Sequence, residues 1–308
     1  MLGGTLPVLA TPFTATGALD LASLRGLVGY VVAAGADGVV FPGVASEFDF
    51  LSPDERNTAL EAVIEAIGGR LPVVVGASAA SAEEAAALAR AGESRGAAAA
   101  MVMAPAAVGR EVEPLLRFFR AVADRIGIPI VMQNAPPPVG AGLPIETMLE
   151  VAAGVFAIRY FKEETLPCGQ RITRLLDGAP VSIEGVMGGA GGRYIVDELN
   201  RGACGTMPAS ELTEVHAAIV RAHRGGDAGR ARALFNRILP LLNFQAVFRM
   251  RMTKAVLRAR GLFESELVRA PGPELDAQDR HELATMLRDV ADLLPEAPPD
   301  LTTLLDAA

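Results

Sequence analysis

The sequence predicts a (β/α)8 TIM barrel followed by a C-terminal helical extension. Short apolar runs, typical of buried parallel strands, alternate with segments of helical periodicity over about 220 residues. Eight such pairs are found, whereas an open doubly wound sheet usually needs fewer strands. From residue 225 onward the strand-like runs stop and helical patterns follow. We therefore expect the barrel at residues 1–224 and a helical region at residues 225–308.

The expected strands are short runs of apolar and β-branched residues. They lie at residues 6–13, 38–43, 73–76, 97–104, 129–134, 156–162, 181–185 and 203–207. Helical patterns start at 19, 52, 81, 111, 145, 170, 193 and 211, and again at 228, 248 and 279. Ser52 illustrates a helix start, because this N-cap residue precedes Pro53 at the first helical position and two acidic residues.

Composition narrows the class of protein. In 308 residues, a hydrophobic content of 51% suffices for a large core, and a net charge of −8 without any basic block makes nucleic acid an unexpected partner. Cys168 and Cys204 form neither a disulfide framework nor the paired spacing of a zinc site, which fits a reducing compartment. No signal-peptide pattern is present, and the uncharged stretch 96–109 is too short to span a bilayer. We expect a soluble, cytoplasmic protein without metal, cofactor or membrane partner.

Lys162 is the residue on which the expected chemistry depends. Only two of the 28 basic residues are lysines, so arginine supplies the ordinary surface charge. At the end of an apolar strand an amine is poorly hydrated, which favours its neutral, nucleophilic form. Such an amine adds to a ketone, and the imine lets a nearby C–H, C–C or C–O bond break. The expected substrate is a 2-keto acid. The alternative is a buried ion pair with Glu164 or Glu184.

The other candidates follow from the rule that TIM-barrel chemistry collects at the carboxyl ends of the strands. The catalytic candidates are Lys162, Gln133 and Tyr160, and the substrate-binding candidates are Ala45, Ser46, Glu47, Asn134, Glu184, Gly185 and Thr206. The loop 43–47 is expected to bind the carboxylate through backbone N–H groups and the Ser46 hydroxyl. Gln133 or Asn134 would orient substrate or water. Protons would be handled by Glu164, Glu184 or Tyr160, the last on the same strand face as Lys162.

Several of these residues also have a plainer interpretation. Ser46 would cap a turn, and Gln133 and Asn134 would satisfy backbone groups of a loop. Tyr160 would be a core aromatic with a satisfied hydroxyl. The glycine-rich loop 188–192 is expected to be a flexible connection rather than a phosphate site. The histidines lie on expected helices and are assigned to the surface: His216, His223 and His281.

Motifs over nearly the whole chain resemble the dihydrodipicolinate synthase/N-acetylneuraminate lyase family of class I aldolases and dehydratases. These motifs are Thr11-Pro12-Phe13, Gly43-Val44-Ala45-Ser46-Glu47, Leu51-Ser52-Pro53-Asp54-Glu55-Arg56, Pro72-Val73-Val74-Val75-Gly76 and Phe161-Lys162-Glu163. The resemblance implies a (β/α)8 barrel with a helical C-terminal region, a homotetramer, and Lys162 as the imine-forming residue.

The chain departs from the family where protons are usually relayed. Gln133 stands at the place of one family tyrosine, Ala106-Ala107 replace a second, and Pro138 stands where the synthase has an arginine. Dihydrodipicolinate synthesis is therefore not expected. The segments 133–136, 160–163, 202–207 and 239–244 are more similar to 2-keto-3-deoxy-sugar-acid dehydratases.

We accordingly expect a Schiff-base lyase that dehydrates or cleaves a 2-keto acid. The alternatives are a pyruvate aldolase similar to the synthase or to N-acetylneuraminate lyase, a metal-dependent aldolase, and a non-catalytic keto-acid-binding barrel.

Overall fold

The computed structural model describes residues 1–305, and in this range strands and helices alternate as a (β/α)8 barrel requires. The strands are β1 (Gly4–Thr5), β2 (Val39–Phe41), β3 (Val73–Gly76), β4 (Ala99–Val102), β5 (Ile130–Asn134), β6 (Ile158–Glu163), β7 (Gly185–Gly188) and β8 (Gly205–Thr206). The helices between them are α1 (Leu21–Ala33), α2 (Pro53–Ile67), α3 (Ala82–Glu93), α4 (Val112–Ala123), α5 (Ile145–Gly154), α6 (Cys168–Gly178), α7 (Ile195–Asn200) and α8 (Thr213–Arg224). The expected barrel fold is confirmed.

The elements after α8 are helical throughout the described residues. They are α9 (Ala228–Phe248), α10 (Met250–Ala259), α11 (Ala277–Asp289) and the short α12 (Thr302–Leu305). Arg249 adopts a positive φ of 49°, which ends α9 and starts α10 one residue later. The helical pattern expected to start at residue 248 corresponds to α10, whereas Phe248 itself is the last residue of α9. The domain boundary at residue 225 stays a prediction.

Contacts group the chain into two compact units. Unit 1 consists of residues 1–4, 72–190 and 194–207, and unit 2 of residues 5–71, 191–193 and 208–308.

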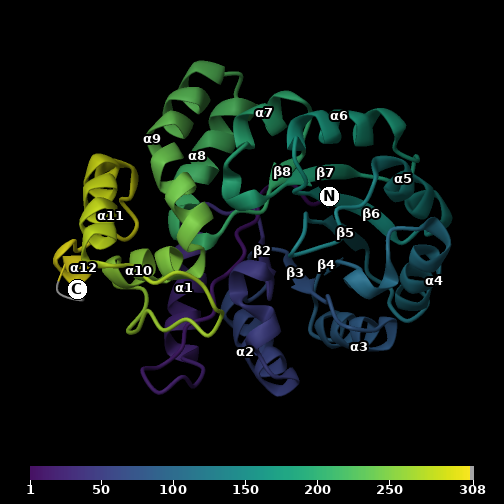
Figure 1. Cartoon of the computed structure of the whole chain (residues 1–308), viewed down its shortest axis with the longest axis horizontal. Coiled ribbons are helices and arrows are strands. Elements are labelled where there is room, and N and C mark those ends of the chain that lie inside the picture. Colours follow the sequence, from purple (N-terminus) through teal and green to yellow (C-terminus); the bar gives the residue numbers. More distant parts are fainter. Residues whose placement is uncertain (306–308) are drawn as a thin grey trace. The chain divides into compact units, whose positions relative to one another are not determined.

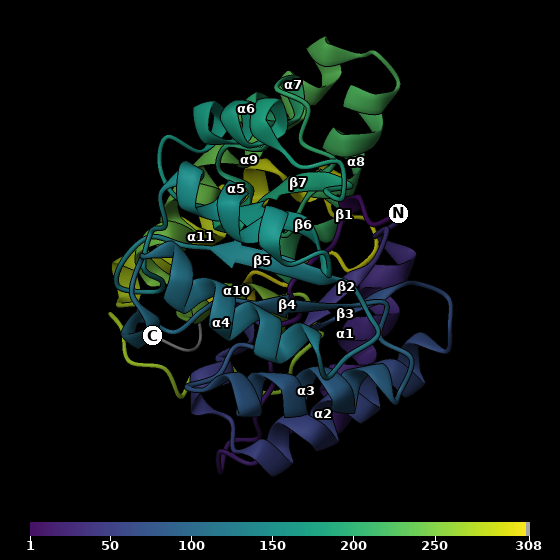
Figure 2. The same cartoon turned by 90° about the vertical axis from the view of Figure 1, so that its right-hand side faces the viewer.

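In unit 1, strands β3 to β8 pair in parallel, each with the next along the chain. Helices α4 and α5 lie in front of this sheet in Figure 2, with α6 above and α3 below the strands in that view. The β5–β6 register places Gln133 opposite Lys162 and Asn134 opposite Glu163. Because residues paired in parallel strands point to the same face, these two pairs point to opposite faces of the sheet.

Unit 2 combines β2, α1 and α2 with the C-terminal helices. Val8 forms parallel bridges to both Val40 and Ala209, so three distant segments meet at this residue. Helices α8 and α9 lie side by side (Figure 1). Helix α2 begins as expected, because Ser52 Oγ accepts from the Glu55 N–H at 3.2 Å and the Glu55 carboxylate accepts from the Ser52 N–H at 2.9 Å.

Strand β7 differs from its expected range of 181–185. The Ile183 N–H donates to Pro180 O at 2.9 Å, so residues 180–183 form a turn, and Val181 is fully exposed. The alternating apolar pattern after Pro180 is thus produced by a turn rather than a strand. The observed strand starts at Gly185, and Glu184 and Gly185 consequently stand at its amino end.

Candidate active site

Lys162 lies near the end of β6 with its side chain almost fully buried. Its Nζ is 3.3 Å from Glu164 Oε2. The opposing residues on the neighbouring strands are Gln133 on β5 and Met187 on β7. The amine therefore lies among buried side chains with one carboxylate in direct contact.

Glu164 follows β6 directly and receives hydrogen bonds on both carboxylate oxygens. Gln133 Nε2 donates to Oε2 at 2.7 Å, and the Ala190 N–H donates to Oε1 at 2.8 Å. Burial raises the pKa of Glu164, but the Lys162 charge and the bonds from Ala190 and Gln133 outweigh it, so the net pKa lies below the ordinary value. The carboxylate is ionised and firmly oriented.

Glycine is required beside this carboxylate. A Cβ at Gly189 would lie 2.5 Å from Glu164 Oε1, closer than packed atoms tolerate. The glycine-rich segment thus makes room for Glu164 and supplies the Ala190 N–H to it. This role was not foreseen for the segment.

The ion pair considered as the alternative for Lys162 is present, and it is compatible with nucleophilic chemistry. A carboxylate 3.3 Å from an ammonium group can take its proton and leave a neutral amine. The group Lys162, Glu164 and Gln133 therefore combines a potential nucleophile, a base and a residue that holds the base in place.

Tyr160 is directed elsewhere, although it shares the strand face of Lys162. Its hydroxyl accepts from the Leu2 N–H at 3.0 Å and donates to Glu184. Burial, followed by the bond to Glu184, raises the pKa of Tyr160 to about 12, so the phenol keeps its proton. Because Glu184 lies at the amino end of β7, the contacts of this hydroxyl argue against a proton relay through Tyr160.

The expected substrate-binding role of Glu184 and Gly185 is corrected, because both residues stand at the amino end of β7. The Glu184 carboxylate forms an ion pair with Arg159 at 2.8 Å, and Gly185 opens β7. The expectation that they bind substrate depended on a strand ending at residue 185. With the observed strand, neither stands at a carboxyl end.

Asn134 is part of a buried network on the other face of the sheet. Its Nδ2 donates to Glu163 at 2.9 Å, and its Oδ1 accepts from the Leu143 N–H at 2.8 Å. Glu163 is fully buried and also pairs with Arg171 at 3.1 Å. Asn134 thus satisfies backbone groups and Glu163, and is corrected from a substrate-binding to a structural residue. Of the two amides, Gln133 is the one beside Lys162.

Thr206 on β8 is paired with Gly188 and is fully buried. Its hydroxyl has no hydrogen-bond partner among residues 1–305. A buried hydroxyl without a partner has the capacity to bind a ligand atom.

The strand-two loop folds as a single 3-10 turn in unit 2, Val44–Ser46. The Ser46 hydroxyl accepts from the Gly43 N–H at 2.9 Å and donates to Leu9 O at 2.5 Å, so it serves as the cap of the turn. The expected donation from this hydroxyl to substrate is corrected, because its proton is already used. Val44 and Ala45 open the turn, so their N–H groups have no acceptor within it.

Glu47 also has a different partner from the expected substrate. Its side chain is buried and lies 2.5 Å from Lys254 Nζ, while Oε2 accepts from the N–H groups of Arg269 and Ala270. Lys254 was overlooked, although the scarcity of lysine that singled out Lys162 applies to it equally.

The histidines were assigned to the surface, and for His216 this is wrong. His216 on α8 is 1% exposed, and burial lowers its pKa to about 4.

The described part of the chain holds no cluster of three or more His, Cys, Asp or Glu side chains suited to a metal ion. No helix within residues 1–305 has both the length and the apolar character needed to cross a membrane.

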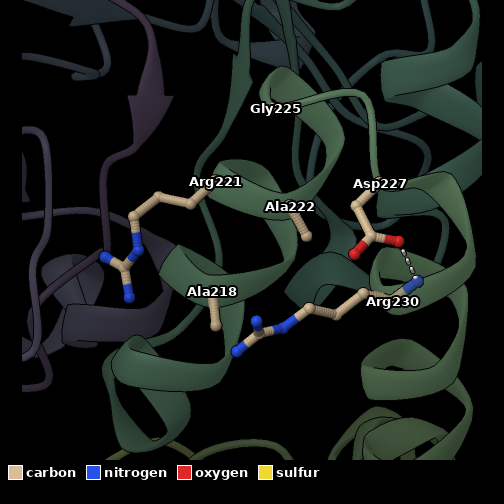
Figure 3. A pocket seen from close by; sticks show the side chains of 6 residues that line it. All are labelled: Ala218, Arg221, Ala222, Gly225, Asp227 and Arg230. Carbon is tan, nitrogen blue, oxygen red and sulfur yellow. Dashed lines mark hydrogen bonds between the residues drawn. The ribbon is translucent and has the colours of Figure 1, made fainter.

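A pocket of about 250 Å³ lies at the turn between α8 and α9 and contains none of the candidate residues. Figure 3 shows its lining, in which the Asp227 carboxylate accepts from the Arg230 N–H at 2.9 Å as the cap of α9. Both arginines of the lining, Arg221 and Arg230, are exposed. The pocket is a surface feature of the helix turn.

Comparison with known proteins identifies the family. Residues 1–290 match the model of the dihydrodipicolinate synthetase family. The chain is 33% identical over 289 residues to L-2-keto-3-deoxyarabonate dehydratase of Azospirillum brasilense, covering 92% of this chain and 93% of that protein. It is 31% identical over 303 residues to 4-hydroxy-tetrahydrodipicolinate synthase 1 of Streptomyces coelicolor, covering 96% and 95%.

A solved structure of a similar protein has the same fold. The chain superimposes on dihydrodipicolinate synthase of Rhodopseudomonas palustris with a TM-score of 0.85 at 26% identity, covering 94% of this chain and 97% of that one. The expected resemblance, fold and enzyme class are confirmed. The chain belongs to the dihydrodipicolinate synthetase family of Schiff-base-forming lyases.

Proposed function

We propose that the chain dehydrates a 2-keto-3-deoxy sugar acid through an imine on Lys162, with Glu164 moving the protons. The observation that carries this proposal is the contact of Lys162 Nζ with Glu164, whose carboxylate is held by Gln133 and the Ala190 N–H. The 33% identity to a protein named L-2-keto-3-deoxyarabonate dehydratase supports the choice of reaction and substrate class.

The first step is addition of neutral Lys162 to the C2 carbonyl of the substrate. Glu164 takes the ammonium proton and the amine attacks C2 to form a carbinolamine. Glu164 then returns the proton to the carbinolamine hydroxyl, which leaves as water as the protonated imine forms, so the carboxylate is free again. The imine then withdraws electrons from C3. This makes a C3–H bond acidic.

The second step uses the same carboxylate twice. Glu164 removes a proton from C3 to give an enamine, and returns it to the C4 hydroxyl as the C3–C4 double bond forms and water leaves. No oxidant or reductant is needed, and hydrolysis of the imine restores Lys162. The low pKa of Glu164 keeps it ionised at neutral pH, so a base is present at the start of the cycle.

Gln133 is proposed as a positioning residue for Glu164, because its amide holds the carboxylate oxygen that faces Lys162. The family tyrosine at this place would relay protons through a phenol. An amide cannot do so, which favours Glu164 as the group that moves protons.

The substrate's carboxylate is proposed to bind the backbone N–H groups of Val44 and Ala45 at the start of the strand-two turn. Support comes from the turn itself, whose two leading N–H groups lack acceptors within it. Thr206 is proposed to bind a substrate hydroxyl, on the strength of its buried, unpartnered Oγ1. We further propose a cytoplasmic homotetramer with no nucleic-acid or membrane partner.

A turnover assay tests the proposed function. The chain is incubated with a panel of 2-keto-3-deoxy pentonic and hexonic acids, and loss of water is followed by NMR. Dehydration of at least one member, abolished in Lys162→Ala, is expected. Aldol cleavage to pyruvate would instead favour the second candidate, a pyruvate aldolase, which the 31% identity to a synthase supports. Ligand-induced stabilisation without product would indicate a binding protein.

A further inference from the structure

The second lysine of the chain, Lys254, is buried and held by an ion pair and a hydrogen bond, although it takes no part in the proposed chemistry. It sits on α10 with a fully buried side chain. Its Nζ lies 2.5 Å from Glu47 Oε1 and donates to Leu267 O at 2.8 Å. The ring of Phe13 lies 4.1 Å from the same nitrogen. The ammonium is thus surrounded by partners other than water.

Glu47, the partner of Lys254, is the residue that ends the strand-two turn. Its backbone is left-handed, with φ 57° and ψ 40°, a conformation that a non-glycine residue adopts only when its surroundings impose it. The side-chain contacts provide that restraint. One oxygen faces Lys254, and the other accepts from the N–H groups of Arg269 at 2.7 Å and Ala270 at 2.6 Å.

The segment that contacts Glu47 is itself anchored. Arg269 donates to both oxygens of Glu55, at 2.9 and 2.6 Å, and to Gly17 O at 2.6 Å. Its guanidinium also lies 4.1 Å from the centre of the Phe13 ring. Residues that follow the barrel strands in the sequence therefore hold the end of the turn through these contacts.

We infer that Lys254 is a positioning residue for substrate binding, which acts through Glu47 to hold the Val44–Ser46 turn in its carboxylate-binding form. This rests on the proposed function of that turn. The ion pair restrains a left-handed residue at the end of that turn.

Lys254 is charged at neutral pH. Burial lowers its pKa to about 8, Glu47 opposes this, and the charges of Arg269 and Arg251 lower it further. The ion pair with Glu47 is therefore present under the conditions of an ordinary assay.

The experiment measures how much ketone half-saturates borohydride trapping on Lys162, using pyruvate and, as a carboxylate-free probe, acetone. The double variant Lys254→Met/Glu47→Gln removes both charges, so that neither is left buried and unpaired. We expect the half-saturating pyruvate concentration to rise at least tenfold, and that of acetone to stay within twofold. A general loss of structure would move both.

Arg260→Met/Glu214→Gln is the matched control, because it also removes both charges of a buried ion pair. Arg260 is buried at the end of α10 and forms an ion pair with Glu214 at 2.5 Å, but contacts none of residues 43–47 in the hydrogen bonds and ion pairs of the described chain. Loss of this pair disturbs the same helix without releasing the turn, and should change neither half-saturating concentration.

A second variant, Ala270→Pro, removes one N–H donor to Glu47 and leaves both charges in place. The half-saturating pyruvate concentration should rise about threefold by the loss of one bond. If both variants trap pyruvate at the wild-type concentration, the inference is overturned while the proposed function stands. If the wild-type chain traps no pyruvate, the proposed function fails, and this inference with it.

Discussion

Replacing Glu164 by glutamine separates the two roles of the site most cleanly. The substituted side chain would keep its length and an oxygen for the Ala190 N–H, but it carries no charge and accepts no proton. The carboxylate is the group in ion-pair contact with Lys162 Nζ, at 3.3 Å, and both its oxygens are engaged. Proton transfer by a positioned group contributes a factor of about 10² to 10⁴. We expect kcat for dehydration to fall by that factor, or about 3–5 kcal/mol in the barrier.

The assay follows water loss from the best substrate of the panel, alongside borohydride trapping of pyruvate. Trapping should persist in Glu164→Gln, because the variant keeps the Lys162 side chain that attacks the ketone. The new amide group of this variant would face the Gln133 amide donor to donor, so a loss of stability of about 1–3 kcal/mol is also expected, unless Gln133 turns its amide. A kcat within threefold of wild type would refute the assignment of Glu164 as the proton-transfer group.

Two other predictions concern groups that the site does not use. Tyr160→Phe should leave kcat within threefold. It should lower the free energy of unfolding in urea by about 1–3 kcal/mol, because the Leu2 N–H and Glu184 lose a hydrogen-bond partner. A hundredfold loss of kcat would instead identify Tyr160 as a proton relay. His216, with its pKa lowered by burial from 6.5 to about 4, is neutral in the folded chain while the unfolded chain takes up a proton below pH 6.5. Its contribution to stability is therefore complete above pH 6.5 and falls toward pH 4 by about 3 kcal/mol, and His216→Gln should flatten urea midpoints over that range. An unchanged slope would exclude His216 as the cause.

The barrel could be predicted because most of its strands lie in short apolar runs that alternate with segments of helical periodicity. Strand β7 shows where this signal fails. Val181 and Ile183 alternate with polar residues as a strand would, but Pro180 starts a turn that shifts the strand to Gly185. A shift of this size moves Glu184 from one end of the strand to the other, and with it an expected site residue.

Strand alternation predicted that Tyr160, Lys162 and Glu164 share a face, but not their contacts. Residues two apart on a strand are about 6.6 Å apart along it, so Tyr160 lies nearer the amino ends of the strands than Lys162 does. Its hydroxyl accordingly meets Leu2 and Glu184. Glu164, on the other side of Lys162 along the chain, reaches the amine.

The partners of Glu47 could not be predicted from local patterns. Lys254 follows it by about 200 residues and lies on a helix whose own periodicity gives no sign of a buried charge. Only the composition pointed to Lys254, because it is one of two lysines in a chain whose other basic residues are arginines.

The central claim is that Lys162 forms an imine with a 2-keto acid, and covalent trapping tests it most directly. The chain is incubated with pyruvate and sodium borohydride, weighed by mass spectrometry, and the modified peptide is sequenced. The account predicts one reduced pyruvate adduct per chain, located on Lys162 and absent in Lys162→Ala. No adduct in the wild-type chain, or an adduct that persists in Lys162→Ala, would contradict it.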